Sequence, residues 1–283
     1  METAIAKSLK QVMEKVNSAI KNSTKTNRCT LVGASKTKPI ELLQQAYDAG
    51  LRHFGENYVD EIVTKSPILP QDIKWHYIGH LQSNKIKQVL VPNLYMLETI
   101  DSIKQGKRLI ILNQQFFITL IRLATKVNKE CQKLSKKLKV LIQVKTSTED
   151  TKSGVSAEDV PALVEFIMTQ CPNLEFSGLM TIGYEGDENA FIQLYDLKIQ
   201  ICEKFKLNKD EIELSMGMSQ DFEKAILYGS TNVRVGTTIF GARDYPMKSQ
   251  CKEEHIDVAE TKQNEQKAEN KQTEAQQEEK KSE

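Results

Sequence analysis

The stretch L-V-G-A-S-K-T-K-P, Leu31 to Pro39, decides the fold and carries the candidate chemistry. The five residues Leu31 to Ser35 have strand character, Lys36 follows them directly, and Pro39 ends the strand. A lysine at the end of a buried strand is costly unless its amine has a role, because an unpaired buried ammonium is strongly disfavoured. Capturing an aldehyde is one such role. Lys38 is the competing amine, and we expect it in an exposed loop beside Pro39.

Composition excludes several classes of protein. The 283 residues carry 39 basic and 38 acidic side chains, a formal charge of +1, so no broad field attracts nucleic acid or an anionic membrane. The five cysteines are scattered and form no C-x-x-C pair, which indicates reduced thiols and no disulfide framework. The sequence contains no H-E-x-x-H motif either, so a metal site is not expected. Lys7, Lys10 and Lys15 interrupt any apolar signal sequence. We expect a cytoplasmic protein, with a mitochondrial pool left open.

Hydrophobic periodicity predicts an amphipathic helix over residues 2–22 and then an alternation of strands and helices. Eight strands are predicted, centred on C-T-L-V-G-A-S-K, L-R-H-F-G-E-N-Y, Trp75–Gly79, Leu94–Thr99, Lys139–Lys145, Glu175–Thr181, Glu211–Met216 and Val233–Phe240. Such alternation favours an α/β fold with a parallel sheet closed as a (β/α)8 TIM barrel, preceded by an extra helix. A doubly wound open sheet is the alternative, but no G-x-G-x-x-G is present.

Two segments fall outside this alternation. Residues 1–247 are assigned to the barrel, and residues 248–283 are rich in Glu, Lys, Gln and Ala, which predicts a disordered charged tail. Residues 105–122, Q-G-K-R-L-I-I-L-N-Q-Q-F-F-I-T-L-I-R, are apolar where a helix should simply continue, and they are too broken by polar residues to span a membrane. We expect this segment to form an extra helix or strand on the outside of the barrel.

Two glycine turns near the end of the predicted barrel suit a phosphate. G-M-S (Gly217–Ser219) follows the seventh strand, and Ser219 is expected to cap a helix over Gln220–Tyr228. G-T-T begins at Gly236 within the eighth strand, where the glycine admits a ligand and Thr237 adds a hydroxyl. In TIM barrels phosphate often binds after strands seven and eight. The alternative is an ordinary helix cap and a strand glycine.

Strand alternation nominates further residues. If Val233 and Val235 pack outward, Arg234 points into the barrel and needs an anion or a ring acceptor. A salt bridge with an interior carboxylate such as Glu56 is equally compatible with the pattern. Asn57 and His80 end the second and third strands, where each could line the barrel mouth or serve as a turn or cap residue.

Five separated motifs, in order, closely resemble the pyridoxal phosphate homeostasis proteins (YggS/PROSC-like barrels), which are related to the N-terminal domain of alanine racemase. The match spans about residues 5–246, and its motifs are L-V-G-A-S-K-T-K-P, H-F-G-E-N-Y-V-D-E, W-H-Y-I-G-H-L-Q-S-N-K, S-G-L-M-T-I-G and L-S-M-G-M-S-Q-D-F-E-K-A-I-L-Y-G-S-T-N-V-R-V-G-T-T-I-F-G-A-R. The resemblance implies pyridoxal 5'-phosphate (PLP) fold type III. It implies that Lys36 holds PLP as a Schiff base and that Arg234 faces the pyridine nitrogen. It implies a phosphate site at Ser219, Gly236 and Thr237, with further cofactor contacts at Asn57, His80, Met216 and Gly217.

The family resemblance also implies a function. Its members are thought to bind PLP and maintain its intracellular supply, which is vitamin B6 homeostasis, without established catalysis. We therefore expect a non-catalytic monomer whose partners are PLP and PLP-requiring apo-enzymes. The alternative is a PLP-dependent amino-acid racemase or lyase, but no second domain that would bring a second acid or base is visible in the sequence. Residues 105–122 have no counterpart in the family, and joining Lys104 to Leu123 restores the expected helix. A translated short intron or a lineage-specific insertion would explain them.

Overall fold

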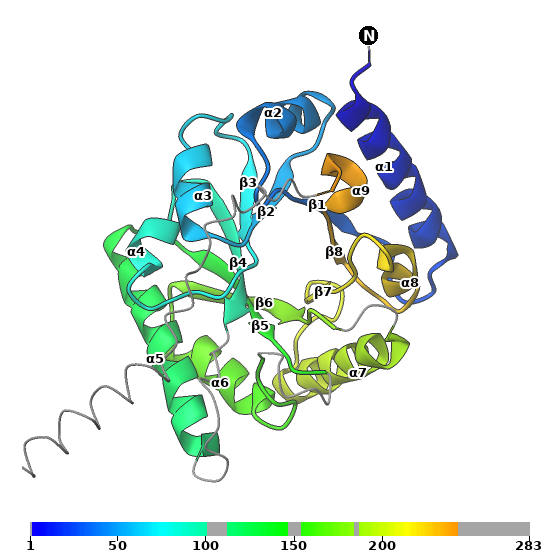
Figure 1. Ribbon diagram of the computed structural model, residues 1–283. Helices are drawn as coiled ribbons and strands as arrows, with labels where there is room; N and C mark the ends of the chain where they lie inside the picture. The colour runs from blue at the N-terminus through cyan, green and yellow to red at the C-terminus, as the bar shows by residue number, and fades with distance from the viewer. Residues whose placement is uncertain (1, 101–111, 147–153, 184–186, 243–283) are drawn as a thin grey trace, which may run out of the picture. The chain divides into compact units, whose positions relative to one another are not determined.

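Eight parallel strands close into a barrel, and helices surround it (Figure 1). The computed structural model describes residues 2–100, 112–146, 154–183 and 187–242. The strands are β1 (Thr30–Ala34), β2 (His53–Glu56), β3 (Lys74–Tyr77), β4 (Leu94–Ile100), β5 (Leu138–Gln143), β6 (Leu174–Met180), β7 (Glu213–Ser215) and β8 (Asn232–Val235). The helices are α1 (Ala4–Asn22), α2 (Ile40–Asp48), α3 (Val59–Lys65), α4 (Ile86–Val89), α5 (Leu112–Lys133), α6 (Val160–Gln170), α7 (Glu188–Phe205), α8 (Phe222–Leu227) and α9 (Thr237–Phe240). The predicted (β/α)8 barrel is confirmed.

Strand β1 closes the barrel, because it pairs with both β2 and β8. Val32 is the register partner of His53 on one side and of Arg234 on the other. Each strand is buried by the ring of helices outside, and apolar residues such as Val233, Val235 and Leu214 pack in that outer core. The sheet thus keeps its apolar side toward the helices, as parallel sheets do.

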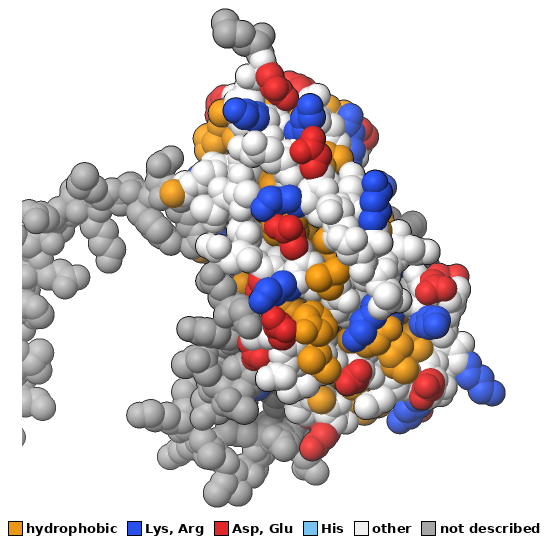
Figure 2. Space-filling view, turned by 90° about the vertical axis from the view of Figure 1, so that its right-hand side faces the viewer, with side chains coloured by type: hydrophobic (Ala, Val, Ile, Leu, Met, Phe, Trp, Pro, Cys, Tyr) orange, Lys and Arg blue, Asp and Glu red, His pale blue; other side chains and the backbone are white. Residues whose placement is uncertain are grey.

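The predicted N-terminal helix is present as α1. The Thr3 hydroxyl caps it by accepting a hydrogen bond from the Ala6 N–H at 3.1 Å. Its buried residues recur every three or four positions and pack α1 on the outside of the barrel against α2, α8 and α9 (Figure 1). Lys15 forms a 3.0 Å ion pair with Glu223 of α8. On the face where α1 lies, basic and acidic side chains are intermingled (Figure 2).

The structure corrects two boundaries. The eighth strand ends at Val235, so Gly236 and Thr237 lie in the turn into α9 and not within a strand. Helix α8 starts at Phe222 with Asp221 at its N-cap position, so Ser219 precedes the helix and does not cap it. Ser219 and its neighbours form a turn, because the Asp221 carboxylate accepts a 2.6 Å hydrogen bond from the Met218 N–H.

The segment 105–122 is only partly described. Residues 112–122 form the first half of α5, which continues without a break to Lys133, so this part is not a separate element. Leu120 is fully buried against the outer core. Residues 105–111 and the predicted tail, 248–283, lie outside the described residues.

Among the described helices, none has the length and apolar character needed to cross a bilayer. The same part of the chain contains no group of His, Cys, Asp and Glu side chains arranged to hold a metal ion.

Candidate functional site

A pocket of about 310 Å³ opens at the carboxyl ends of the strands. It lies where the loops after β1, β2, β3, β6, β7 and β8 converge, which is the functional end of a TIM barrel. Six of the residues nominated from the sequence line it: Lys36, Asn57, Ser219, Arg234, Gly236 and Thr237. Its other lining residues are Ala34, Lys38, Ile78, Met180, Ile182, Met218, Gln220, Asp221 and Gly241.

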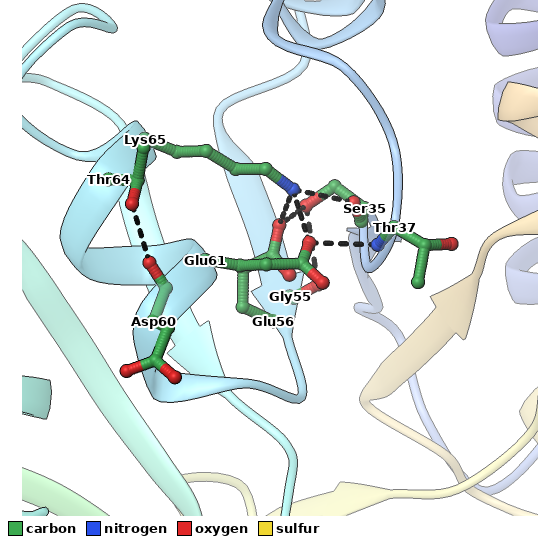
Figure 3. A network of polar contacts seen from close by, with 8 residues as sticks. All are labelled: Ser35, Thr37, Gly55, Glu56, Asp60, Glu61, Thr64 and Lys65. Atoms are coloured by element: carbon green, nitrogen blue, oxygen red, sulfur yellow. Dashed lines mark hydrogen bonds and ion pairs between the residues drawn. The ribbon is translucent and has the colours of Figure 1, made fainter. Parts of the chain in front are cut away.

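The backbone on both sides of Lys36 is held by one buried polar network (Figure 3). The Lys65 ammonium, from α3, donates to the Ser35 carbonyl at 3.0 Å and to the Glu56 and Glu61 carboxylates at 2.8 and 2.6 Å. Glu61 in turn accepts a 2.8 Å hydrogen bond from the Thr37 N–H. Thr37 has a φ of 61°, a backbone conformation that a threonine rarely adopts. The network therefore fixes the turn that presents Lys36 to the pocket.

Glu56 is the buried anchor of this network. Its Oε1 accepts from the Ser35 hydroxyl at 2.7 Å and from Lys65, while its Oε2 is buried without a hydrogen-bond partner among the described residues. Burial raises the pKa of the Glu56 carboxyl to about 7, and the positive charge of Lys65 opposes that shift. Glu56 is thus occupied by Lys65, so it is not the interior partner of Arg234 that the sequence left open.

The expected position of Lys38 was wrong. Its side chain is buried, lines the pocket and donates a hydrogen bond to the carbonyl of Ala242. Strand β1 ends at Ala34, and the following turn brings both Lys36 and Lys38 to the same cavity. The pocket therefore offers two amines, and the ammonium of Lys38 is bound to a backbone carbonyl.

The turn after β7 meets the end of β8 on one side of the pocket. The Ser219 hydroxyl accepts a 3.2 Å hydrogen bond from the Gly236 N–H, which joins the two turns. A Cβ at Gly236 would lie 3.1 Å from the Ala34 carbonyl oxygen, so the backbone here approaches β1 more closely than a larger residue readily allows. Thr237 adds a second hydroxyl beside Ser219. The hydroxyl residues Ser219 and Thr237 thus line this wall of the pocket, and such donors suit an anion.

Arg234 enters the same pocket from β8 and is fixed by two hydrogen bonds. Its Nη1 donates to the Ser215 hydroxyl at 2.6 Å and its Nη2 to the Thr181 carbonyl at 2.8 Å. Burial lowers the pKa of the guanidinium, and the charges of Glu98 and Asp221 oppose that shift. Because an arginine remains protonated in proteins, the pocket contains a permanent and oriented positive charge.

A buried polar chain beneath the pocket was missed by the sequence analysis. Glu98 of β4 accepts from the Ser215 hydroxyl at 2.5 Å, from Asn232 at 3.1 Å and is 2.6 Å from His76 Nδ1. His76 Nε2 lies 2.8 Å from Nδ1 of His53. Burial lowers the pKa of His53 to about 3. Burial alone would raise the pKa of the Glu98 carboxyl. The hydrogen bond to His76 and the charge of His76 outweigh burial, so the pKa of Glu98 is lowered. The only sequence signal was a glutamate in the apolar strand Y-M-L-E-T-I.

The remaining nominated residues divide into two groups. Asn57 lines the pocket, and its buried Oδ1 has no hydrogen-bond partner among the described residues, so an acceptor is available for a ligand. Met216, Gly217 and His80 are not among the described lining residues. Met216 packs in the outer core, the Gly217 carbonyl accepts from the Arg234 N–H at 3.0 Å, and the His80 carbonyl accepts from the Tyr77 hydroxyl.

Comparison with known proteins identifies the family. Residues 8–244 match the model of the alanine racemase N-terminal domain family. The pyridoxal phosphate homeostasis protein of Homo sapiens is 41% identical over 264 residues, which cover 87% of this chain and 90% of the human protein. The chain belongs to the pyridoxal phosphate homeostasis protein family. The family member of Caenorhabditis elegans is 41% identical over 254 residues, 86% of this chain and 98% of the nematode protein.

Solved structures give the same result for the fold. PipY of Synechococcus elongatus, solved with PLP bound, superposes with a TM-score of 0.66 at 28% identity, covering 84% of this chain and 100% of PipY. Alanine racemase of Clostridium difficile superposes with a TM-score of 0.60 at 12% identity, covering 86% of this chain and 58% of the racemase. The pyridoxal phosphate homeostasis family thus shares its barrel with the racemase.

Proposed function

We propose that this chain binds PLP in the pocket at the carboxyl ends of its strands and acts in intracellular PLP homeostasis. The observation that carries the proposal is that one pocket, in a member of this family, is lined by Lys36 and by Ser219, Gly236 and Thr237. The names of the relatives and the PLP-bound PipY structure support this choice of ligand.

The residues present fit the chemistry of PLP at both ends of the molecule. PLP supplies an aldehyde that bonds covalently to a primary amine and a ring that can withdraw electrons from such an adduct. Lys36 is the amine that would hold the aldehyde carbon, because its turn is fixed by the Lys65 network. Ser219, Gly236 and Thr237 would hold the phosphate through hydroxyl and N–H donors.

Arg234 would face the pyridine nitrogen. Its guanidinium keeps its proton and presents only donors, so it would keep a nearby ring nitrogen unprotonated. An unprotonated ring withdraws electrons less strongly, which favours holding the cofactor over reaction at a bound amino acid. The two hydrogen bonds from Arg234 to Ser215 and Thr181 would fix this arrangement.

The charged residues of the pocket favour a non-catalytic role over a racemase. Racemisation needs an acid or base on each face of the reacting carbon. Of the described titratable residues that line the pocket, Lys38 is bound to the Ala242 carbonyl, Asp221 to the Met218 N–H, and Arg234 stays protonated. Lys36 is the one acid or base that we assign among these described residues, because it is the amine proposed to hold PLP.

An absorbance experiment separates the candidate functions. The purified chain is loaded with PLP and its spectrum is compared with those of Lys36→Ala and Lys38→Ala. We expect the visible band of lysine-bound PLP in the wild type and in Lys38→Ala and its loss in Lys36→Ala. Loss of the band from Lys38→Ala alone would refute the assignment of Lys36, and no band in any of the three proteins would favour a scaffold without cofactor.

Incubation of the loaded protein with D- and L-alanine or serine tests catalysis. Sustained formation of isomerised or deaminated product would favour the racemase or lyase.

Homeostasis also requires release to an acceptor. We propose that the chain acts in the cytoplasm as a monomer and passes PLP to PLP-requiring apo-enzymes. The described cysteines are all free thiols, which suits a reducing compartment. The test is reactivation of a PLP-requiring apo-enzyme by the loaded chain, with Lys36→Ala treated with PLP in the same way as the control, and no reactivation by the loaded wild type would contradict delivery.

A further inference from the structure

A second pocket, of about 280 Å³, lies at the opposite end of the barrel from the Lys36 pocket. It is formed by the loop between α1 and β1, by one side of α7 and by residues just before β7 and β8. All of these loops precede strands, whereas the Lys36 pocket is formed by loops that follow strands. The lining residues are Ser23, Thr24, Lys25, Thr26, Asn27, Arg28, Tyr195, Lys198, Ile199, Lys209, Asp210 and Thr231.

The pocket wall is held in shape by hydrogen bonds within the α1–β1 loop. The Ser23 hydroxyl donates to the Ile226 carbonyl at 2.9 Å and accepts from the N–H groups of Lys25 and Thr26. The Arg28 guanidinium crosses to the β7 side and donates twice to the Asp210 carbonyl, at 3.2 and 2.8 Å. The cavity is therefore preformed, and a ligand would not have to order these loops.

Lys198 is the unusual residue of this pocket. Its side chain, on α7, is only 5% exposed, and within the described part of the chain no hydrogen bond or ion pair is made by its ammonium. Burial lowers the pKa of Lys198, and the charge of Arg28 lowers it further, whereas Cys202, Asp210 and Glu213 oppose the shift. The Lys198 ammonium therefore meets the cavity at the end of an otherwise buried side chain, and its partial desolvation costs free energy that a bound anion in the pocket would offset.

The other charges around the pocket are also mostly positive. Lys25, Arg28, Lys198 and Lys209 line it against one carboxylate, that of Asp210. The Lys25 ammonium lies 4.2 Å from the centre of the Tyr195 ring, so its position over the cavity wall is fixed by a cation–π contact. Serine and threonine hydroxyls fill much of the remaining lining. Ammonium and hydroxyl donors around a small cavity suit a compact oxyanion such as phosphate.

We propose that this pocket binds a small phosphate-bearing anion, with the Lys198 ammonium as its central contact. The cavity holds a small molecule and not a segment of a macromolecule, since it is only about 280 Å³. The anion could be free phosphate or a phosphate monoester, because the recognised group is the same. The site is independent of the proposed PLP site and uses none of its residues.

The test is a calorimetric titration of PLP-loaded protein with inorganic phosphate at constant ionic strength. Loading with PLP blocks the phosphate position at Ser219 and Thr237. We expect saturable binding to the wild type and about tenfold weaker or no binding to Lys198→Met, because a charge-assisted contact is lost. Lys204→Met is the matched control, since Lys204 is an exposed lysine of the same helix that does not line the pocket, and it should bind like the wild type.

Two additions keep the result interpretable. Lys209→Glu reverses an exposed charge on the rim, which leaves folding intact, and it should also weaken binding. A titration with phenyl phosphate in place of phosphate distinguishes the two possible ligands. Tighter binding of phenyl phosphate indicates a phosphate monoester, and equal binding indicates free phosphate. Equal affinity of wild type and Lys198→Met, or no saturable binding at millimolar phosphate, would overturn the proposal. If the chain does not retain PLP, the same titration of the free protein still tests Lys198, so the two proposals fail separately.

Discussion

The Glu98 carboxylate and the Ser215 hydroxyl are joined by a 2.5 Å hydrogen bond that crosses the interior of the barrel. Glu98 is on β4 and Ser215 on β7, and these strands are not neighbours in the closed sheet. The same hydroxyl accepts the hydrogen bond from Arg234. One serine therefore connects a fully buried carboxylate to the guanidinium of the pocket and fixes the direction in which that guanidinium points.

Removing the charge of Glu98 should destabilise the fold. Glu98→Gln keeps the shape of the side chain but leaves Arg234 buried without a nearby anion other than Asp221. We expect a loss of about 3 kcal/mol in the free energy of unfolding, since the substitution leaves the buried charge of Arg234, which is linked to Glu98 through Ser215, less well compensated. Urea denaturation measures it. Glu175→Gln is the control, because Glu175 is half-exposed in a 3.8 Å pair with Lys139 and should change stability by less than about 1 kcal/mol. Equal effects of the two substitutions would refute the buried network.

The Glu56–Lys65 pair should make stability depend on pH. The pKa of Glu56 is raised in the folded state to about 7 from an ordinary value of 4.5, so the folded chain binds a proton more tightly than the unfolded chain. The stability that this proton contributes is complete below pH 4.5 and is lost as the pH rises through 7, and it amounts to about 3 kcal/mol. We therefore expect the free energy of unfolding to fall between pH 5 and 8 in the wild type.

Glu56→Gln should remove that part of the slope, because the amide does not titrate. The measurement is a series of urea unfolding curves across this pH range for both proteins. Burial also raises the pKa of Glu213. Glu213 changes the free energy of unfolding in the same direction in both proteins, so its effect cancels from the difference. Parallel pH profiles would show that Glu56 does not titrate in this range.

Much of the barrel could be predicted from the sequence, because each strand is a short apolar run between turn residues. Successive side chains of a strand point to opposite faces, and this alternation also predicts that Arg234 points into the barrel. The pattern does not reveal which residues meet across the interior, and so Glu98 and Ser215 were missed. It also misplaced Lys38, because the residues after β1 turn back into the mouth instead of following the strand direction. Turn geometry decides where such side chains lie, and Asp221, not Ser219, occupies the N-cap position of α8.

The phosphate end of the pocket can be tested separately from the amine. Ser219→Ala combined with Thr237→Val removes two hydroxyl donors and should weaken PLP binding about tenfold or more, since hydrogen bonds to a charged group contribute about 1.5–3 kcal/mol each. Pyridoxal, which lacks the phosphate, is the control ligand and should bind both proteins equally. Absorbance titration gives both affinities. Equal loss for the two ligands would show that the substitutions distort the pocket and do not act on a phosphate.

Residues 105–122 should be dispensable for cofactor binding. None of residues 117–122, the part of this segment whose side chains the structure describes, lines the Lys36 pocket, and joining Lys104 to Leu123 continues the sequence D-S-I-K-L-A-T-K-V-N-K into the rest of α5. We expect the deletion variant to unfold cooperatively and to retain the visible band of bound PLP. Sequencing the spliced message would show whether the segment is encoded in it. A variant that is insoluble or lacks the band would show that the segment belongs to the fold.

The site assigned to PLP depends on which of two amines in the pocket captures the aldehyde. Borohydride reduction of the loaded protein makes that bond permanent, and mass analysis of its peptides then locates it. The account predicts one pyridoxyl group per chain, on Lys36, and an unmodified Lys38. A pyridoxyl group on Lys38, or one spread over surface lysines with Lys36 unmodified, would contradict it.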